Sequence, residues 1–358
     1  MLHAFLCAAA PLLAFKTLPV QDGPVGLLEF EVAGRTDADG PRPVLLALPP
    51  GAQNRKMVEA GERLYWKAEA LRLGWTVISP IAPEGESLSG SNIRRVLELV
   101  DQVEKTYDVE YGRLHVAGVS NGGRTALELA LGHADRFASL SLLPGMQEGV
   151  GGEELAALVR LPIAMYVGGD DSAWRKPMQT MSDELTKLGH PPARFRVFEG
   201  EGHTPKSLTG AILFQTLESF RVSAALEDFH DAAAKADGVR YFNHFAPDAI
   251  YMGTDATERW TVGEFKEFAG PYFAKGTGWT YVSSERHTFV APGGQTAWFD
   301  ELLDNDSYGV TRGTGAFVRT DAGWKMVQYH LTIPMPNGLA KTFVDMIRKD
   351  KGAEEKRR

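Results

Sequence analysis

A serine between two glycines is the first candidate for chemistry in this chain: residues 118–122 read GVSNG, inside "RLHVAGVSNGGRTALELAL". The residues before Ser120 predict a strand and those after Asn121 predict a helix. A serine on such a sharp turn can act as a nucleophile, because the turn lifts its hydroxyl clear of the sheet. Gly118 and Gly122 occupy the two positions where a side chain would collide with the turn. The motif alone is common in ordinary turns, so its meaning depends on partners elsewhere.

A serine nucleophile needs a base to take its proton and a carboxylate to orient that base. In proteins with this kind of turn, both follow downstream, each just after a strand. Here Asp170 and Asp171 follow "IAMYVGG", and His203 follows "FRVFEGEG". Taken separately, such a histidine is usually structural, and an Asp pair is often a turn or a helix cap. Their common order and placement favour a triad of Ser120, His203 and one of the two aspartates.

Two backbone N–H groups are candidate donors to the oxyanion that an ester carbonyl forms when it is attacked. The predicted helix after Ser120 presents N–H groups and a partial positive charge at its N-terminus, so the Asn121 N–H is the first candidate. The second should come from the loop after an early strand. That loop reads "LPPGAQN", and the Ala52 N–H, following Gly51, is the candidate.

Short apolar strands alternate with helices from residue 24 to residue 221, which predicts an α/β domain with a mostly parallel sheet and helices on both faces. After residue 221 the pattern of apolar residues changes. One amphipathic helix, "VSAALEDFHDAAAKAD", is followed by long strands in which apolar and polar residues alternate, joined by turn residues. We expect an α+β domain with an antiparallel meander at 222–340, and a C-terminal helix with a charged tail at 341–358.

Residues 24–220 resemble the α/β-hydrolase superfamily, most of all the feruloyl esterases, the polyhydroxybutyrate depolymerases and the phospholipase/carboxylesterase group. The resemblance is carried by "IRRVLELVDQVEKTYDVEYGRLHVAGVSNGGRTALELAL", "GGDD" and "EGEGHTP". In that pattern the acid is the fourth residue of Gly-x-x-Asp counted from Gly168, which selects Asp171 over Asp170. These families usually carry His-Gly in the oxyanion loop, where this chain has Pro50-Gly51. The resemblance implies a serine carboxylic-ester hydrolase that works through an acyl-enzyme without a cofactor.

Residues 223–338 resemble the SnoaL-like branch of the NTF2-like superfamily, an α+β cone that encloses a pocket. The matching stretches include "LEDFHDAAAKAD", "GTDATERWTVGEF" and "RGTGAFVRTDAGWKMVQYHLTIPMPN". Strand alternation puts Trp298 and Asp300 on one face and Glu301 on the other. It also puts four residues of the last strand on a common face, namely Trp324, Met326, Gln328 and His330. The candidate pocket residues are Tyr251, Trp298, Asp300, Glu301 and His330, although the aromatic residues and His330 equally suit a core.

The composition limits the classes of partner. The chain has 358 residues, 44% of them hydrophobic, and a net charge of −8, which suits two globular cores. It has no basic stripe, so we expect no nucleic-acid partner. A single cysteine, Cys7, excludes an intrachain disulfide and thiolate metal sites, and the histidine spacing predicts no metal.

The N-terminal stretch "MLHAFLCAAAPLLAF" has the length and apolarity of a signal-peptide core. It is too short to span a bilayer, and no integral span is expected. We read residues 1–23 as a leader segment and favour export to the periplasm or the medium over the cytoplasm. A first apolar strand or a mis-chosen start codon is the alternative.

The sequence favours a serine ester hydrolase, acting on a small-molecule or polymer-end ester, with an accessory NTF2-like domain that binds a small ligand or forms a homodimer. Two alternatives stay open. One is a non-catalytic hydrolase scaffold that carries an NTF2-like binding module. The other is an isomerase or lyase centred on the C-terminal pocket. The sequence does not name the ester.

Overall fold

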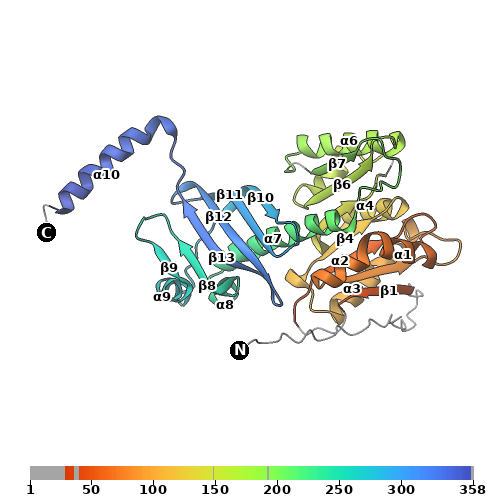
Figure 1. Ribbon diagram of the computed structural model, residues 1–358, viewed down its shortest axis with the longest axis horizontal. Helices are drawn as coiled ribbons and strands as arrows, with labels where there is room; N and C mark the ends of the chain where they lie inside the picture. Colours follow the sequence, from red (N-terminus) through yellow and green to blue (C-terminus); the bar gives the residue numbers. More distant parts are fainter. Residues whose placement is uncertain (1–28, 36–39, 148, 192, 356–358) are drawn as a thin grey trace, which may run out of the picture. The chain divides into compact units, whose positions relative to one another are not determined.

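The computed structural model describes residues 29–35, 40–147, 149–191 and 193–355. The expected leader segment and Cys7 lie outside the described residues. The chain forms two compact units (Figure 1). The first unit runs to Ala224 and includes Val290–Gly294 and Asp321–Gly323, and the second takes the remaining described residues.

A seven-stranded sheet forms the centre of the first unit, in the order β1-β3-β2-β4-β5-β6-β7. β1 is antiparallel to β3, and the other neighbouring strands are parallel. The prediction of a mostly parallel sheet is therefore confirmed. The strands are β1 (Glu29–Gly34), β2 (Val44–Leu48), β3 (Thr76–Ile81), β4 (Leu114–Gly118), β5 (Phe137–Leu142), β6 (Ile163–Gly168) and β7 (Arg194–Phe198).

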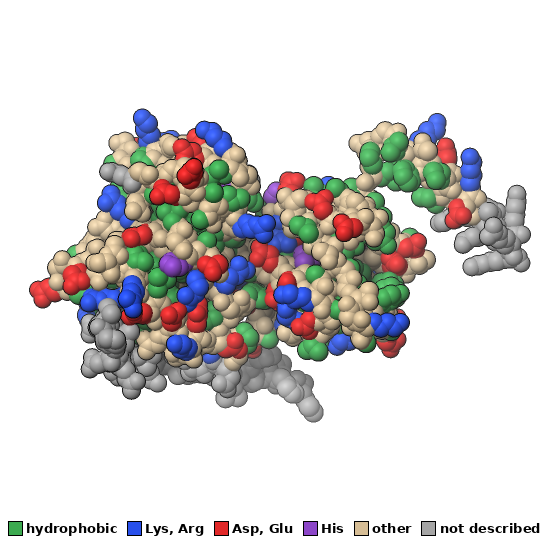
Figure 2. Space-filling view, turned by 180° about the vertical axis from the view of Figure 1, so that it is seen from behind, with side chains coloured by type: hydrophobic (Ala, Val, Ile, Leu, Met, Phe, Trp, Pro, Cys, Tyr) green, Lys and Arg blue, Asp and Glu red, His purple; other side chains and the backbone are tan. Residues whose placement is uncertain are grey.

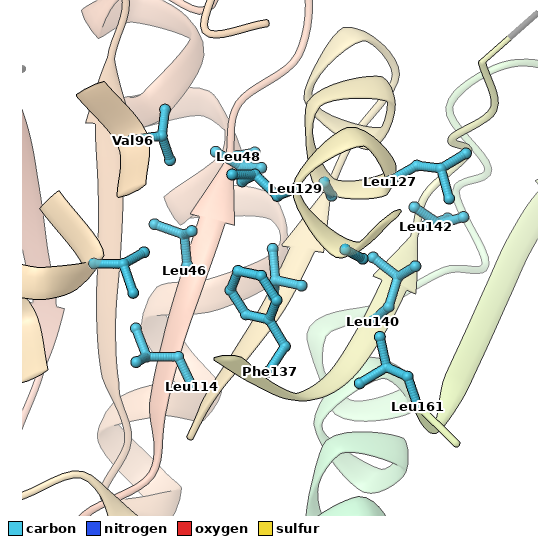
Figure 3. Packing of buried hydrophobic residues seen from close by; sticks show 14 of the residues in the cluster. Leu46, Leu48, Val96, Leu114, Leu127, Leu129, Phe137, Leu140, Leu142 and Leu161 are labelled. Atoms are coloured by element: carbon cyan, nitrogen blue, oxygen red, sulfur yellow. The ribbon is translucent and has the colours of Figure 1, made fainter. Parts of the chain in front are cut away.

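Helices cover both faces of this sheet, because its central strands are apolar on both sides. Leu46 and Leu48 of β2 pack with residues of α3, α4 and α6 (Figure 3). Leu45 and Ala47 point the other way and pack with α2 and α7. The helices are α1 (Arg55–Gly61), the π-helical turn η1 (Glu62–Trp66), α2 (Lys67–Leu73), α3 (Ile93–Thr106), α4 (Asn121–His133), α5 (Gly152–Leu155), α6 (Ser172–Lys187) and α7 (Gly210–Ala234), with 3₁₀ turns at Gly90–Asn92, Glu110–Gly112, Ala134–Arg136 and Ala156–Leu158.

The helix α7 is one continuous helix of 25 residues. From the sequence, a separate helix was expected to begin at residue 222, at the domain boundary. Within the first unit, a buried ion cluster anchors α7: the Arg221 guanidinium binds Glu218 at 2.9 Å and Glu110 at 2.6 Å. Burial alone would lower the pKa of Arg221, but these two carboxylates outweigh it and raise that pKa above its ordinary value. No helix-breaking residue stands at 222, so the apolar pattern runs on through it.

The second unit contains a six-stranded sheet in the order β10-β11-β12-β13-β8-β9. The pairs β11–β12 and β8–β9 are antiparallel, but β8 pairs with β13 in parallel. The expected purely antiparallel arrangement is wrong at that pairing, because β8 precedes the meander in the chain and joins the sheet beside its last strand. The elements are α8 (Gly238–Asn243), β8 (Phe245–Met252), β9 (Arg259–Thr261), α9 (Val262–Phe273), β10 (Val282–Val290), β11 (Thr296–Asn305), β12 (Gly309–Thr320), β13 (Gly323–Thr332), a 3₁₀ turn (Asn337–Leu339) and α10 (Ala340–Glu355).

Aromatic side chains fill the interior of the second unit. The Tyr251 ring stacks on Phe265 at 3.8 Å between ring centroids and lies 5.5 Å from Tyr329. The Phe229 ring stacks on Tyr241 at 4.4 Å. Large rings bury much apolar area each, and stacked or edge-to-face pairs add about 0.5–1.5 kcal/mol beyond that burial. Tyr251, which was a candidate pocket residue, is thus part of the aromatic core.

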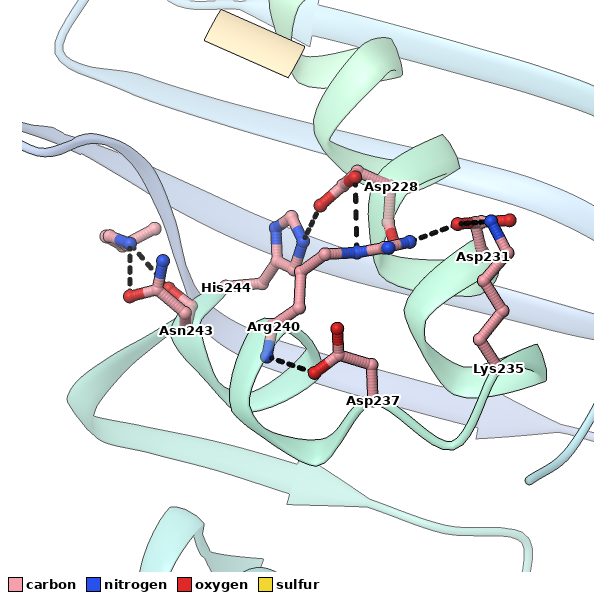
Figure 4. Close-up of polar contacts among 8 residues, drawn as sticks. Asp228, Asp231, Lys235, Asp237, Arg240, Asn243 and His244 are labelled. Atoms are coloured by element: carbon pink, nitrogen blue, oxygen red, sulfur yellow. Dashed lines mark hydrogen bonds and ion pairs between the residues drawn. The ribbon is translucent and has the colours of Figure 1, made fainter. Parts of the chain in front are cut away.

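Ion pairs hold the end of α7 to α8 within the second unit (Figure 4). Asp228 binds the His244 ring at 2.9 Å and the Arg240 guanidinium at 3.3 Å. Asp231 pairs with Arg240 and with Lys235. The neighbouring Asp237 carboxylate accepts the backbone N–H of Arg240 and caps α8. The cluster fixes the turn between the two helices.

One side of α10 is apolar and exposed, as Figure 2 shows for the hydrophobic side chains along this helix. Its exposed apolar side chains include Phe343, Val344, Met346 and Ile347. Across the described part of the chain, no helix combines the length and apolarity that a membrane span requires. Acidic and basic side chains alternate over the face seen in Figure 2, without a large patch of one sign.

Candidate functional site

Ser120 sits on a strained turn between β4 and α4. Its backbone has φ +56° and ψ −114°, a region that non-glycine residues rarely adopt and that costs about 1–3 kcal/mol. The turn is held by the Ser120 N–H, which donates to the Pro144 carbonyl at 2.9 Å. A Cβ on Gly118 would fall on the carbonyl of Gly122, and one on Gly122 would fall on the carbonyl of Leu48. Both glycines are therefore required by close backbone contact.

Ser120, His203 and Asp171 form a chain of hydrogen bonds. The His203 Nδ1 lies 2.7 Å from Asp171 Oδ2, and the His203 Nε2 lies 2.9 Å from Ser120 Oγ. A carboxylate can only accept, so His203 donates from Nδ1. In the neutral ring, Nε2 is then the acceptor, and the Ser120 hydroxyl donates to it. This arrangement lets the ring take the hydroxyl proton.

Asp171, rather than Asp170, meets the histidine. Asp171 precedes the first residue of α6, but its side chain makes no capping hydrogen bond there. Its carboxylate is 10% exposed and turns to His203, which is 43% exposed. Asp170 is exposed, and its N–H donates to the Glu201 carbonyl. The alternative role of the Asp pair as a helix cap therefore does not apply to the Asp171 side chain.

The loops after β6 and β7 are tied together, which sets the position of His203 relative to Asp171. The Glu201 carbonyl accepts the Asp170 N–H at 2.9 Å, and the Glu201 carboxylate accepts the Ser207 N–H at 3.1 Å. Hydrogen bonds from Ser207 lower the pKa of the Glu201 carboxyl. A Cβ on Gly168 would fall on the Gly202 carbonyl, so the two loops approach at backbone distance.

The expected oxyanion loop is fastened to the nucleophile turn. The Asn121 side chain donates from Nδ2 to the Gly51 carbonyl at 2.9 Å. The Gln53 N–H donates to the Pro50 carbonyl at 3.0 Å, which closes the turn around Ala52. Among the residues that the structure describes, neither the Ala52 N–H nor the Asn121 N–H donates to another group. Both therefore stay available as donors.

Gln53 is a residue of this site that the sequence analysis missed. Its side chain is 1% exposed and its backbone φ is +54°. Its Nε2 donates to Thr125 Oγ1 at 3.2 Å, and its Oε1 accepts the Leu88 N–H at 2.7 Å. The loop is thus held by a buried amide on one side and by Asn121 on the other. A lone glutamine after a Pro-Gly turn carries no sequence signal for this role.

Trp174 lies beside the histidine and Arg124 lies over the Trp174 ring, and neither residue was expected at this site. The Trp174 ring is 5.5 Å from the His203 ring, centroid to centroid. The Arg124 guanidinium carbon lies over the Trp174 ring, 4.9 Å from its centroid. One feature of the sequence could have pointed to Arg124: it follows Ser120 by four residues, which is about one helical turn.

The five candidate pocket residues of the second unit do not share a face. Tyr251 and Glu301 are buried, whereas Trp298 is 48% exposed and the Asp300 side chain is 51% exposed. His330 is half-buried and lies next to the buried Tyr329, so it points to the other side of β13. The structure therefore does not bring these five residues together.

The predicted common face of the last strand is wrong as well. Trp324 and Met326 are buried, but Gln328 is exposed and Tyr329 takes the inward position. The pairing of β13 with β8 shifts register between Met326 and Gln328. Such an irregularity moves every later side chain to the opposite face, which strict alternation cannot anticipate.

Glu301 is the centre of a buried ion cluster in the second unit. Its carboxylate lies 2.8 Å from His230 Nε2 and 2.8 Å from the Arg286 guanidinium, and it is 0% exposed. Burial alone would raise the pKa of Glu301, but His230 and Arg286 outweigh it and lower that pKa. Burial, together with Glu301, raises the pKa of the Tyr329 hydroxyl well above its ordinary value. The carboxylate has its partners within the protein.

The described residues contain no group of histidine, cysteine, aspartate and glutamate side chains that could hold a metal ion.

Comparisons with known proteins give a family for the second unit only. Residues 222–336 match the family model of the SnoaL-like domain. A solved NTF2-like protein from Pseudomonas putida KT2440 is 14% identical, with 34% of this chain and 90% of that chain covered and a TM-score of 0.31. A protein of the DUF3225 family from Pectobacterium atrosepticum SCRI1043 is 19% identical, with 34% and 94% covered and a TM-score of 0.29.

A thermostable esterase is similar over 60% of this chain, with 14% identity and a TM-score of 0.48. The match covers 62% of that chain, so this protein spans less than two thirds of the esterase's length. No curated protein matches the sequence. Residues 222–336 are therefore a SnoaL-like domain of the NTF2-like superfamily, as the resemblance in the sequence indicated.

Proposed function

We propose that residues 24–221 form an α/β hydrolase that cleaves carboxylic esters, with Ser120 as nucleophile, His203 as base and Asp171 as the acid that orients it. The observation that carries the proposal is the hydrogen-bonded chain from Ser120 through His203 to Asp171. It stands on a turn whose backbone strain exposes the serine at the end of β4. Strain of this kind is concentrated at functional sites.

In the first half of the reaction, Ser120 Oγ attacks the ester carbonyl while its proton passes to His203 Nε2. Asp171 accepts from Nδ1 and stabilises the positive charge of the imidazolium. The Ala52 and Asn121 N–H groups donate to the oxyanion of the tetrahedral intermediate. The C–O bond to the alcohol then breaks, and His203 gives its proton to the leaving oxygen. The product is an acyl-Ser120 ester.

In the second half, water takes the place of the alcohol. His203 removes a proton from the water, whose oxygen attacks the acyl carbonyl. The bond to Ser120 Oγ breaks, and the proton returns from His203 to the serine. The carboxylic acid leaves and the enzyme is restored. The reaction requires no cofactor.

The SnoaL-like unit is proposed as an accessory domain. An isomerase or lyase centre at Glu301 has little support, because that carboxylate is buried and already paired with Arg286 and His230. A general base must reach a proton of the substrate. The exposed and stacked rings of Phe289 and Trp298 on the outer side of the sheet suit a homodimer contact better. Export from the cytoplasm remains part of the proposal.

Labelling with a fluorophosphonate tests the proposal directly. The reagent modifies a serine only when that serine is activated by a base. We expect one adduct in the intact mass of the full chain, mapped to Ser120 by peptide analysis. Replacing His203 by alanine should abolish the adduct, while Asp170→Asn should leave it in place.

Absence of an adduct on the folded protein would overturn the proposal and would favour the non-catalytic scaffold. An adduct on another serine, or one that survives His203→Ala, would contradict the assigned roles. Circular dichroism of each variant shows whether the fold is kept. The same samples then serve for a screen of small esters and of oligomeric ester ends.

A further inference from the structure

Arg124 lies in the first turn of α4, four residues after Ser120, which is the N-cap of that helix. Its backbone N–H donates to the Ser120 carbonyl at 3.1 Å, so the first turn of α4 joins the two residues. Residues four apart on a helix lie on one face. The Arg124 side chain is exposed.

The aromatic ring of Trp174 fixes the position of this guanidinium. Trp174 is partly buried against the hydrophobic core of the first unit, so its ring is anchored. One part of the ring meets His203 and another carries Arg124, at centroid distances of 5.5 Å and 4.9 Å. A cation over a ring is held in place without losing its charge, because the ring has no net charge. Arg124 is therefore a cation positioned over the ring that lies next to His203.

Arg175, the residue after Trp174, shows the contrast. Arg175 binds both oxygens of Glu199, at 3.1 and 3.0 Å, and also donates to the Gly169 carbonyl. Its charge is paired within the protein. For Arg124, no carboxylate of the described residues lies at ion-pair distance. The planar donors of Arg124 are thus left for a ligand.

We propose that Arg124 binds a carboxylate of the substrate, so that this site selects esters that carry a carboxylate close to the scissile bond. The inference rests on the proposed ester hydrolysis at Ser120. A guanidinium presents paired N–H donors that match the two oxygens of a carboxylate. Trp174, whose ring lies next to His203, holds these donors over its own ring. An uncharged ester gains nothing from them.

Two matched pairs of esters test the selectivity on either side of the scissile bond. On the acyl side, the para-nitrophenyl monoester of adipic acid is compared with the same ester of adipic acid monoamide. On the alcohol side, para-carboxyphenyl hexanoate is compared with para-carbamoylphenyl hexanoate. Within each pair a carboxylate is replaced by an uncharged amide of the same shape. The measured quantity is the ratio of the two kcat/KM values.

We expect a ratio above one for the full chain in at least one pair. Arg124→Gln should lower that ratio by about 10- to 100-fold, the range of a charge-assisted hydrogen-bonded contact. Arg124→Lys should restore part of it, since the charge stays and the fork is lost. Arg94→Gln is the control, because it removes the same charge from a side chain that is 77% exposed on α3.

A wild-type ratio of one or below in both pairs would overturn the inference. So would an Arg124→Gln protein that keeps the wild-type ratio, or an Arg94→Gln protein that loses it. Fluorophosphonate labelling of Ser120 separates the two proposals. Labelled protein without selectivity refutes only the role of Arg124, whereas unlabelled protein refutes the proposed function and the inference with it.

Discussion

Each unit of this protein places a histidine against a carboxylate, but the surroundings of the two pairs differ. In the first unit, His203 is 43% exposed, meets Asp171 on one ring nitrogen and meets the Ser120 hydroxyl on the other. In the second unit, His230 is 8% exposed, and its Glu301 partner is shared with Arg286. Asp171 holds its histidine alone, whereas Glu301 is shared in the interior between the His230 ring and the Arg286 guanidinium.

The difference teaches what separates a reactive pair from a structural one. A base can transfer protons only if its free nitrogen reaches a substrate or a nucleophile. A buried carboxylate with an arginine partner instead stabilises the packing of its neighbours, and removing it leaves uncompensated charge. A histidine beside a carboxylate can therefore serve either end, according to its exposure and to the third partner.

A third histidine completes the comparison. His115 in β4 is buried, and its Nδ1 lies 2.7 Å from the Ser139 hydroxyl. It thus has a serine, as His203 does, but within the described residues it has no carboxylate at ion-pair distance. Burial, followed by the positive charges of Arg221 and Arg113, lowers the pKa of His115 to about 3. This ring stays neutral where His203 is proposed to gain a proton.

The largest expected effect is a difference in kcat between variants of Ser120 and Ser139, the two serines that contact histidines. Ser120→Ala should lower kcat by about 10⁵- to 10⁶-fold, because the nucleophile itself is lost. Ser139→Ala should leave kcat within about twofold of wild type and lower the free energy of unfolding by about 1–3 kcal/mol, since it leaves a buried ring nitrogen without its partner. Steady-state kinetics and urea unfolding measure the two quantities. Retained turnover in pure Ser120→Ala would end the assignment.

The two adjacent aspartates should differ almost as much. Asp171→Asn should lower kcat by about 10³- to 10⁴-fold, because an amide no longer holds His203 in the required tautomer. Asp170→Asn should leave kcat nearly unchanged, since its exposed side chain is not bound to the histidine. Equal losses in both variants would mean that the general charge of this loop matters, and not the contact to Nδ1.

The carboxylates of β11 provide the matching pair in the second unit. Glu301→Gln should lower the free energy of unfolding by about 3–5 kcal/mol, because Arg286 and His230 lose a buried partner. Asp300→Asn, one residue away on the outer face, should change it by less than about 1 kcal/mol, as exposed pairs do. Urea unfolding of the full chain measures both. Similar values for the two variants would contradict the structural role of Glu301.

The smallest expected effect is a change in how steeply the free energy of unfolding depends on pH. It tests the contribution of His115 alone. The unfolded chain binds a proton on this ring between pH 6.5 and about 3, whereas the folded protein does not. The free energy of unfolding therefore falls as the pH drops through that window, by about 1.4 kcal/mol per pH unit. In His115→Gln this slope should be shallower by that amount, whatever its stability at neutral pH. Unfolding curves at pH 6 and pH 4 give the slope, and an unchanged slope would refute the assignment to His115.

Much of the first unit could be predicted from its sequence. The apolar runs of β2, β4 and β6 could be recognised as strands, because a parallel strand is buried on both faces. Ser120, His203 and the pair Asp170 and Asp171 could be named because each follows such a run, and the carboxyl ends of parallel strands meet at one edge of the sheet. The choice of Asp171 within the pair came from the resemblance to the hydrolase families. Gly118 and Gly122 could be named because only a residue without a side chain fits the turn.

Other features depended on contacts between residues distant in the chain. Gln53 binds Thr125 and the Leu88 backbone, and no local pattern marks a buried amide. The inward face of β13 was predicted wrongly, since its pairing with β8 shifts register. The predicted break at 222 fell inside the continuous helix α7, where a change of domain left no mark on the helical pattern.

By itself, the sequence determined which residues could perform chemistry and in which order they follow the strands, because strand periodicity and turn sterics are local properties of the chain. Tertiary structure alone decided which histidine is exposed, which carboxylate stands beside it, and which arginine has no carboxylate partner among the described residues. Exposure and pairing arise when distant segments pack together. Glu301 and Asp171 are both acidic residues close to a histidine, and only the fold separates them.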